Sequence, residues 1–105
     1  MELRHLRYFI AVAETGSLRV AAEQRLHTSQ PSLSRQIRDL EEEVGAPLFR
    51  RSTQGVELTA AGQAFFEHAL PALSQIDAAV AEARRAAVPE SQQFAVGFLI
   101  GREIP

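Results

Sequence analysis

Three stretches in the first half of the chain carry apolar residues at helical spacing. The first runs from Leu3 to Gly16, and the second begins at the cap residue Ser17. The third runs from Ser29 to the stop at Gly45-Ala46-Pro47, where glycine and proline end a helix. The pattern therefore predicts three helices before residue 48.

The third predicted helix has a buried side and a free side. Its apolar residues recur at steps of four, three and four: Leu33, Ile37, Leu40 and Val44. At about 100° per residue, the residues that point away are Pro31, Arg35, Arg38 and Glu42, with Ser32 and Ser34 at the flanks. Hydroxyl and guanidinium groups near the positive end of a helix dipole suit phosphates and base edges.

A β-hairpin is predicted after the third helix. Residues 48–51 and 56–58 are short apolar-containing runs around the polar, glycine-containing loop 52–55. Three helices and a hairpin describe a mainly α winged helix-turn-helix. A plain three-helix bundle, the alternative, leaves the hairpin and the polar helix face unexplained.

A fourth, long helix is predicted from the cap residue Thr59 to about Ala87. Apolar and small residues alternate steps of four and three, which is typical of a coiled-coil seam. The seam residues assigned to dimerisation are Phe66, Ala69, Leu73, Ile76, Val80 and Ala83. A helix on the order of 40 Å long exceeds what a small core can cover, so a second copy of the chain is the expected cover. The alternative is a helix packed on its own domain.

The sequence of residues 89–105 predicts a change of structure after the long helix. Pro89-Glu90-Ser91-Gln92-Gln93 is typical of a linker, and Phe94 to Ile100 is an apolar, strand-like run. A buried strand needs neighbours that the remaining sequence does not supply. We therefore expect a winged helix-turn-helix in residues 1–58, a linker and dimerisation helix in 59–88, and a hinge with the first strand of a truncated domain in 89–105.

Composition narrows the function classes. The 105 residues contain no cysteine and carry a net charge of −2, whereas nucleic-acid binders are usually basic. Residues 60–105 account for that charge, and five of the eleven arginines lie between residues 25 and 51, so a DNA-binding surface must be a focused patch. Solvated arginines on a globular domain are the alternative on charge alone. No apolar run is long enough to span a membrane, and we expect a cytoplasmic protein.

Catalysis and metal binding have little support in the sequence. The three histidines, His5, His27 and His68, lack metal-ligand spacing, and no nucleophile–base or paired-carboxylate arrangement is visible. We expect no catalytic residue, no metal and no cofactor in this chain, and we do not expect an enzyme.

An ordered set of motifs in residues 1–88 resembles the N-terminal DNA-binding region and linker helix of LysR-type transcriptional regulators. The motifs are Leu6-Arg7-Tyr8-Phe9, Gly16-Ser17, Ala21-Ala22, Ser29-Gln30-Pro31-Ser32-Leu33-Ser34, Ile37, Leu40-Glu41, Gly45, Leu48-Phe49-Arg50-Arg51 and Leu58-Thr59-Ala60-Ala61-Gly62. The resemblance implies a homodimer that binds an interrupted palindrome in double-stranded DNA. It also implies assembly of up to four chains and a small-molecule inducer that binds a domain beyond residue 105.

The resemblance also implies which residues meet DNA. The residues assigned to DNA binding are Thr28, Gln30, Pro31, Ser32, Ser34, Arg35, Arg38, Arg50 and Arg51. Arg38 could instead pair with Glu41 or Glu42 on its own helix. Because Arg50 and Arg51 alternate along a strand, only one of the two is expected to face DNA, and a solvated hairpin is the alternative.

One departure from the family pattern lies just before the third helix. Glu23, Gln24 and Arg25 stand between Ala22 and Leu26, where the family usually has two residues. The extra residue is expected to reshape the turn that carries His27 and Thr28. We interpret the chain as a sequence-specific DNA-binding regulator, with a winged-helix protein–protein interaction module as the alternative.

Overall fold

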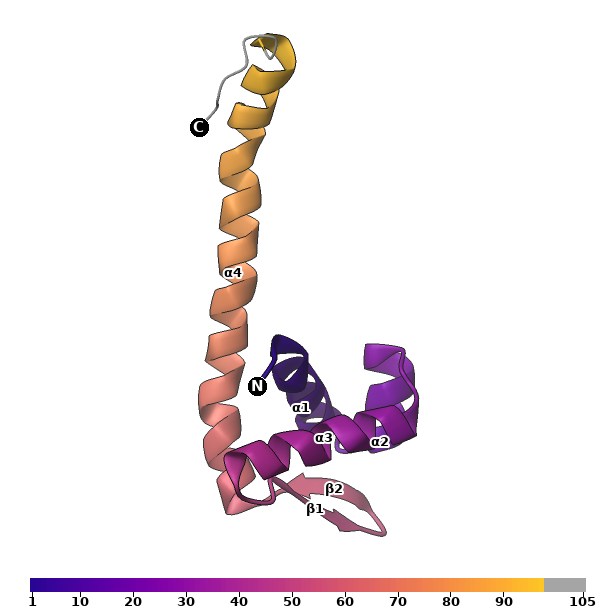
Figure 1. Ribbon diagram of the computed structural model, residues 1–105. Helices are drawn as coiled ribbons and strands as arrows, with labels where there is room; N and C mark the ends of the chain where they lie inside the picture. Colours follow the sequence, from indigo (N-terminus) through magenta and orange to yellow (C-terminus); the bar gives the residue numbers. More distant parts are fainter. Residues whose placement is uncertain (98–105) are drawn as a thin grey trace. The chain divides into compact units, whose positions relative to one another are not determined.

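The computed structural model describes the backbone of residues 1–97 and the side chains of residues 1–88. The chain separates into one unit from Met1 to Leu73 and a second that begins at Ser74. The elements are α1 (Leu3–Thr15), α2 (Leu18–Val20), the π-helix η1 (Ala21–Leu26), α3 (Gln30–Val44), β1 (Phe49–Ser52), β2 (Gly55–Leu58) and α4 (Ala60–Gly97). This element order confirms the predicted mainly α winged helix-turn-helix followed by a long helix (Figure 1).

The core of the first unit surrounds Phe9 on α1, whose side chain is fully buried. Its ring lies 5.1 Å from that of Phe49, 5.0 Å from that of Phe65 and 6.3 Å from that of Phe66, measured between centroids. Such aromatic pairs favour tilted and edge-on arrangements, as seen here. One α1 residue thus joins the wing to the first turns of α4.

Local capping explains where the helices begin and end. Ser29 Oγ accepts the N–H of Ser32 at 3.1 Å, and Thr59 Oγ1 accepts the N–H of Gly62 at 3.0 Å. Gly45 ends α3 in the left-handed conformation with φ 88°, which a residue with a Cβ adopts at a cost. Val44, expected on the buried face, is 39% exposed because it lies in the last turn, beyond the core.

The second helix differs from expectation. Ser17 caps it as predicted, but only Leu18–Val20 is α-helical, and Ala21–Leu26 forms a π turn. In a π turn the hydrogen bonds close from i to i+5, so the turn holds one more residue than an α turn. The additional residue between Ala22 and Leu26 is accommodated in this way.

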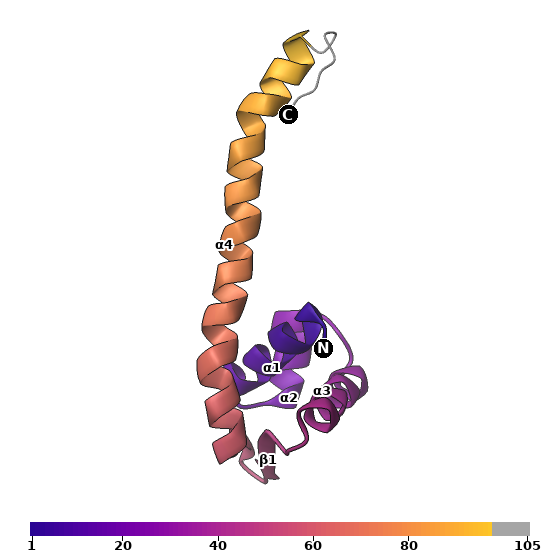
Figure 2. The same ribbon diagram turned by 60° about the vertical axis from the view of Figure 1, so that its left-hand side comes forward.

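The hairpin has an antiparallel register that pairs Phe49 with Leu58 and Ser52 with Gly55. The N–H of Val56 donates to the carbonyl of Gly16 at 3.0 Å, so the wing is tied to the corner that follows α1. In Figures 1 and 2 the C-terminal end of α3 lies beside this hairpin, and hydrogen bonds from the start of β1 join the two. The wing is thereby fixed relative to α3.

The α4 helix extends farther than expected. It runs to Gly97 and includes residues 89–93, where a linker was predicted, and residues 94–97, where a strand was predicted. Glu, Gln and Ala favour a helix, and each added residue gains one backbone bond, whereas a lone strand has no partner. The last residues of the predicted strand, 98–100, lie outside the residues that the structure describes.

Among the described residues, no helix is long and apolar enough to cross a membrane.

Candidate nucleic-acid interface

The buried stripe of α3 sets the direction of its polar face. Leu33, Ile37 and Leu40 are buried in the core. The opposite side exposes Gln30, Pro31, Arg35 and Arg38, and Ser32 and Ser34 are half-buried at its flanks. The arrangement follows the helical spacing of the sequence, and it brings the predicted side chains of α3 together on one surface.

The two arginines of α3 have free charges. Among the residues whose side chains the structure describes, neither Arg35 nor Arg38 forms an ion pair. The alternative pairing of Arg38 with Glu41 is not made, because the Glu41 carboxylate binds backbone N–H groups instead. Both guanidinium groups remain available to an anionic partner.

The hydrogen bonds of Glu41 to the backbone were not predicted from the sequence. Its Oε2 accepts the N–H of Leu48 at 2.8 Å and that of Phe49 at 3.2 Å. In the sequence Glu41 stands in the acidic run Glu41-Glu42-Glu43, whose other two members are exposed. Glu41 differs from its neighbours in lying four residues after Ile37, beside the apolar stripe, and that spacing was the available signal.

The two wing arginines differ in their surroundings. Arg50 pairs with Glu57 across the hairpin at 3.5 Å, in line with their register. Arg51 makes no ion pair within the described side chains and is one of the residues that line a cavity of about 50 Å³ between the wing and α3. The other residues that line this cavity are Leu18, Ile37, Glu41, Phe49 and Val56.

We call Gln30, Pro31, Arg35, Arg38 and Arg51 together the recognition face.

Thr28 belongs to the turn before α3. Its side chain is half-buried, and its backbone N–H donates to the carbonyl of Ala22 at 3.0 Å. The turn therefore closes back onto η1, and Thr28 borders the recognition face.

The residues predicted to form the dimerisation seam fall into two groups that differ in their burial within the single chain. Ala69 is 4% exposed and belongs to the core of the first unit, while Phe66 and Leu73 are partly buried against that core. Ala69 therefore has little side-chain surface left for a partner chain. Phe66 and Leu73 help to cover the aromatic cluster around Phe9, and their assignment to dimerisation stays a prediction. Ile76 and Val80, each 42% exposed, and the exposed Ala83 keep the predicted apolar spacing on α4.

The described side chains include no group of three histidine, aspartate or glutamate residues placed to hold a metal ion. The arrangement instead offers free guanidinium groups, hydroxyls and an amide on one rigid helix. Such groups bind phosphates and base edges.

Comparison with known proteins agrees with this geometry. The sequence model of the family described as "Bacterial regulatory helix-turn-helix protein, lysR family" matches residues 3–63. The Hca operon transcriptional activator HcaR of Escherichia coli (strain K12) is 53% identical over 104 residues, which cover 99% of this chain and 34% of HcaR. The HTH-type transcriptional regulator BudR of Klebsiella aerogenes is 54% identical over 98 residues, which cover 93% of this chain and 68% of BudR.

A solved structure shows the same fold bound to DNA. The complex of BenM_DBD with catB site 1 DNA superposes with a TM-score of 0.80 at 46% identity and covers 84% of this chain and 98% of that one. The chain spans about a third of the length of HcaR.

Proposed function

The chain belongs to the LysR family of bacterial regulatory helix-turn-helix proteins, and we propose that its recognition face binds double-stranded DNA in a sequence-specific way. The observation that carries the proposal is the free, exposed pair Arg35 and Arg38 on a helix whose opposite side is locked in the core. A rigid helix presents its side chains in a fixed geometry, which readout of base edges requires. The BenM_DBD complex, which contains DNA, supports this choice.

The residues of the recognition face, and Ser34 at its flank, are each given a role by their chemistry. Gln30 suits adenine and Arg35 suits guanine, because each can form two hydrogen bonds that discriminate bases by about 1–3 kcal/mol. Pro31 offers an apolar contact to a thymine methyl group. Ser34, Arg38 and Arg51 suit phosphates, which fix the register of the protein without specifying sequence.

We place dimerisation on the exposed part of the seam. Ile76, Val80 and Ala83 lie at steps of four and three on α4, and no residue of the described chain buries them. A second copy of the same helix is the natural cover for such a stripe. Two copies would present two recognition faces, so the expected operator is an interrupted palindrome.

Other features of the regulator follow from this proposal. Assembly into tetramers and response to a small-molecule inducer are expected of the longer family members, and a DNA-binding regulator works in the cytoplasm. The cavity beside Arg51, at about 50 Å³, has room for water and not for an organic inducer. No specific observation favours the protein–protein docking alternative.

Binding-site selection from random duplex DNA tests the proposal. The 105-residue chain is expected to enrich a two-fold symmetric, interrupted sequence, and its affinity is expected to fall as salt rises. Enrichment of no sequence, together with binding that is insensitive to salt, would refute DNA recognition.

A further inference from the structure

The backbone that leads into α3 is unusual. The carbonyl of Ala22 accepts the cap N–H of His27 and also that of Thr28, the latter at 3.0 Å. His27 has φ 52°, and it is the one residue other than glycine with positive φ among the described residues. A π turn followed by a left-handed non-glycine residue is an uncommon way to enter a helix.

The core holds both ends of the π turn while its middle faces outward. Ala21 and Ala22 are fully buried, and Leu26 packs against the same core. Glu23, Gln24 and Arg25 are exposed. The additional residue therefore widens the turn toward solvent and leaves the core contacts of Ala22 and Leu26 in place.

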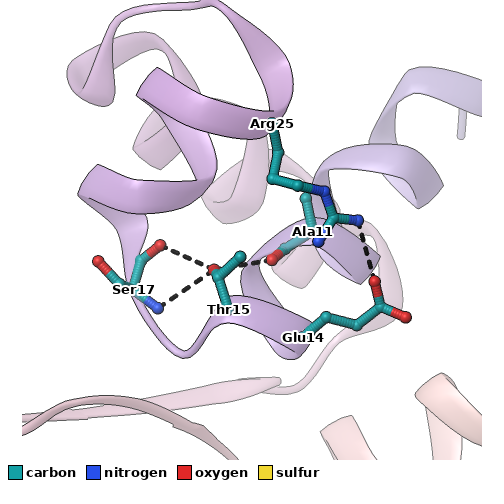
Figure 3. Close-up of polar contacts among 5 residues, drawn as sticks. All are labelled: Ala11, Glu14, Thr15, Ser17 and Arg25. Carbon is teal, nitrogen blue, oxygen red and sulfur yellow. Dashed lines mark hydrogen bonds and ion pairs between the residues drawn. The ribbon is translucent and has the colours of Figure 1, made fainter.

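An ion pair joins the widened turn to α1. Arg25 Nη2 lies 2.9 Å from Glu14 Oε1. Figure 3 marks this contact with a dashed line. The next residue, Thr15, donates its hydroxyl to the carbonyl of Ala11 at 2.8 Å and accepts the N–H of Ser17 at 3.4 Å. Glu14 therefore lies at a helix end that these hydrogen bonds stabilise, and its ion pair with Arg25 connects the turn to α1.

We infer that η1, held by the Arg25–Glu14 pair, is a positioning element that sets the entry of α3 and thereby its sequence preference. The turn ends at His27, Thr28 closes onto Ala22, and Ser29 and Gln30 follow directly as the cap and first residue of α3. In a turn one residue shorter, Leu26 would keep its face but would follow Ala22 by a different rotation about the helix axis, so Thr28 and Gln30 would leave the turn in a different direction. The inference rests on the proposed DNA recognition, because it concerns how the first turn of α3 meets the bases.

Deletion of Gln24 is the direct test. It shortens the π turn to an α turn and keeps Leu26 on the face of Ala22, since steps of three and four share a helix face. Gln24→Ala, which keeps the length, is the matched control. Each protein is put through selection from random duplex DNA, and its affinity for the wild-type duplex and for unrelated duplex is measured, with urea unfolding as a check on the fold.

The deletion variant is expected to bind unrelated duplex as wild type does but to lose at least about ten-fold in affinity for the wild-type duplex. It is expected to select different bases opposite the first turn of α3, whereas Gln24→Ala changes neither readout. Selection of the wild-type sequence with wild-type affinity by the deletion variant would overturn the inference. If wild type itself selects no sequence, the proposed function fails, and the inference fails with it.

If the deletion variant does not fold, Arg25→Ala tests whether the ion pair with Glu14 contributes to the sequence preference. The pair is exposed, so its loss is expected to leave the unfolding midpoint near that of wild type. The ratio of specific to unrelated binding is expected to fall about two- to five-fold, and Arg25→Lys to restore part of it. An unchanged ratio would overturn the inference.

Discussion

Oε2 of Glu41 accepts a hydrogen bond from the backbone N–H of Leu48 at 2.8 Å, and this contact joins α3 to the wing. Leu48 is fully buried and immediately precedes β1. One acidic side chain on α3 therefore contacts the backbone at the start of the hairpin. Together with the bond from Val56 N–H to the carbonyl of Gly16, this contact helps to hold the wing against the helices.

Glu41→Ala is expected to lower the free energy of unfolding by about 1–3 kcal/mol, because it leaves two backbone N–H groups without their acceptor. Glu42→Ala removes the same charge one residue later, from an exposed side chain, and is expected to have little effect. Urea denaturation of both variants measures the difference. Equal effects would show that the carboxylate of Glu41 does not hold the wing.

Gly62→Ala is expected to destabilise the fold, although alanine usually stabilises a helix relative to glycine. A Cβ at this position would lie 2.0 Å from the carbonyl oxygen of Leu48, which is backbone and cannot move aside cheaply. We expect a loss of about 1–3 kcal/mol or more, as for overpacked cores. Thermal unfolding checks the sign, and a raised midpoint would contradict the close approach of α4 to this carbonyl.

The wing arginines are expected to contribute unequally to DNA binding. Arg50 is paired with Glu57, whereas Arg51 makes no ion pair within the described side chains. Arg51→Ala is therefore expected to reduce the slope of log affinity against log salt by about one, the effect of one lost phosphate contact. Arg50→Ala is expected to change the slope less. Titrations at several salt concentrations measure both slopes, and the reverse order would refute the assignment.

Ile76→Glu is expected to shift the chain from dimer to monomer without unfolding it. The side chain is 42% exposed in the single chain, so its charge costs little there and becomes unfavourable once a partner buries it. Ser74→Glu adds the same charge at an exposed polar position and serves as the control. Sedimentation over a concentration series distinguishes the species, and dimers of equal strength in both variants would place the interface elsewhere.

Helix starts were predictable because they depend on neighbours in the sequence. Ser29 with Ser32, and Thr59 with Gly62, form caps within three residues. The exposed face of α3 followed in the same way from the period of its apolar residues. These local patterns were sufficient to identify the winged helix-turn-helix and the exposed side chains of α3.

What the sequence did not reveal depends on the tertiary fold. The π turn forms because the core fixes Ala22 and Leu26 while one more residue must fit between them. The seam of α4 is divided because Phe65 and Phe66 cover Phe9. Helical periodicity alone cannot say whether the apolar stripe is covered by its own domain or by a second chain.

The central claim is that the exposed face of α3 reads DNA, and the most direct test is the affinity of Arg35→Ala for the selected duplex. Arg84→Ala, which removes the same charge from an exposed site on α4, is the matched control. At fixed salt we expect Arg35→Ala to bind about 5- to 150-fold more weakly than wild type, as for one lost bidentate base contact. Arg84→Ala is expected to stay within about two-fold. Wild-type affinity in Arg35→Ala, or equal losses in the two variants, would contradict the claim.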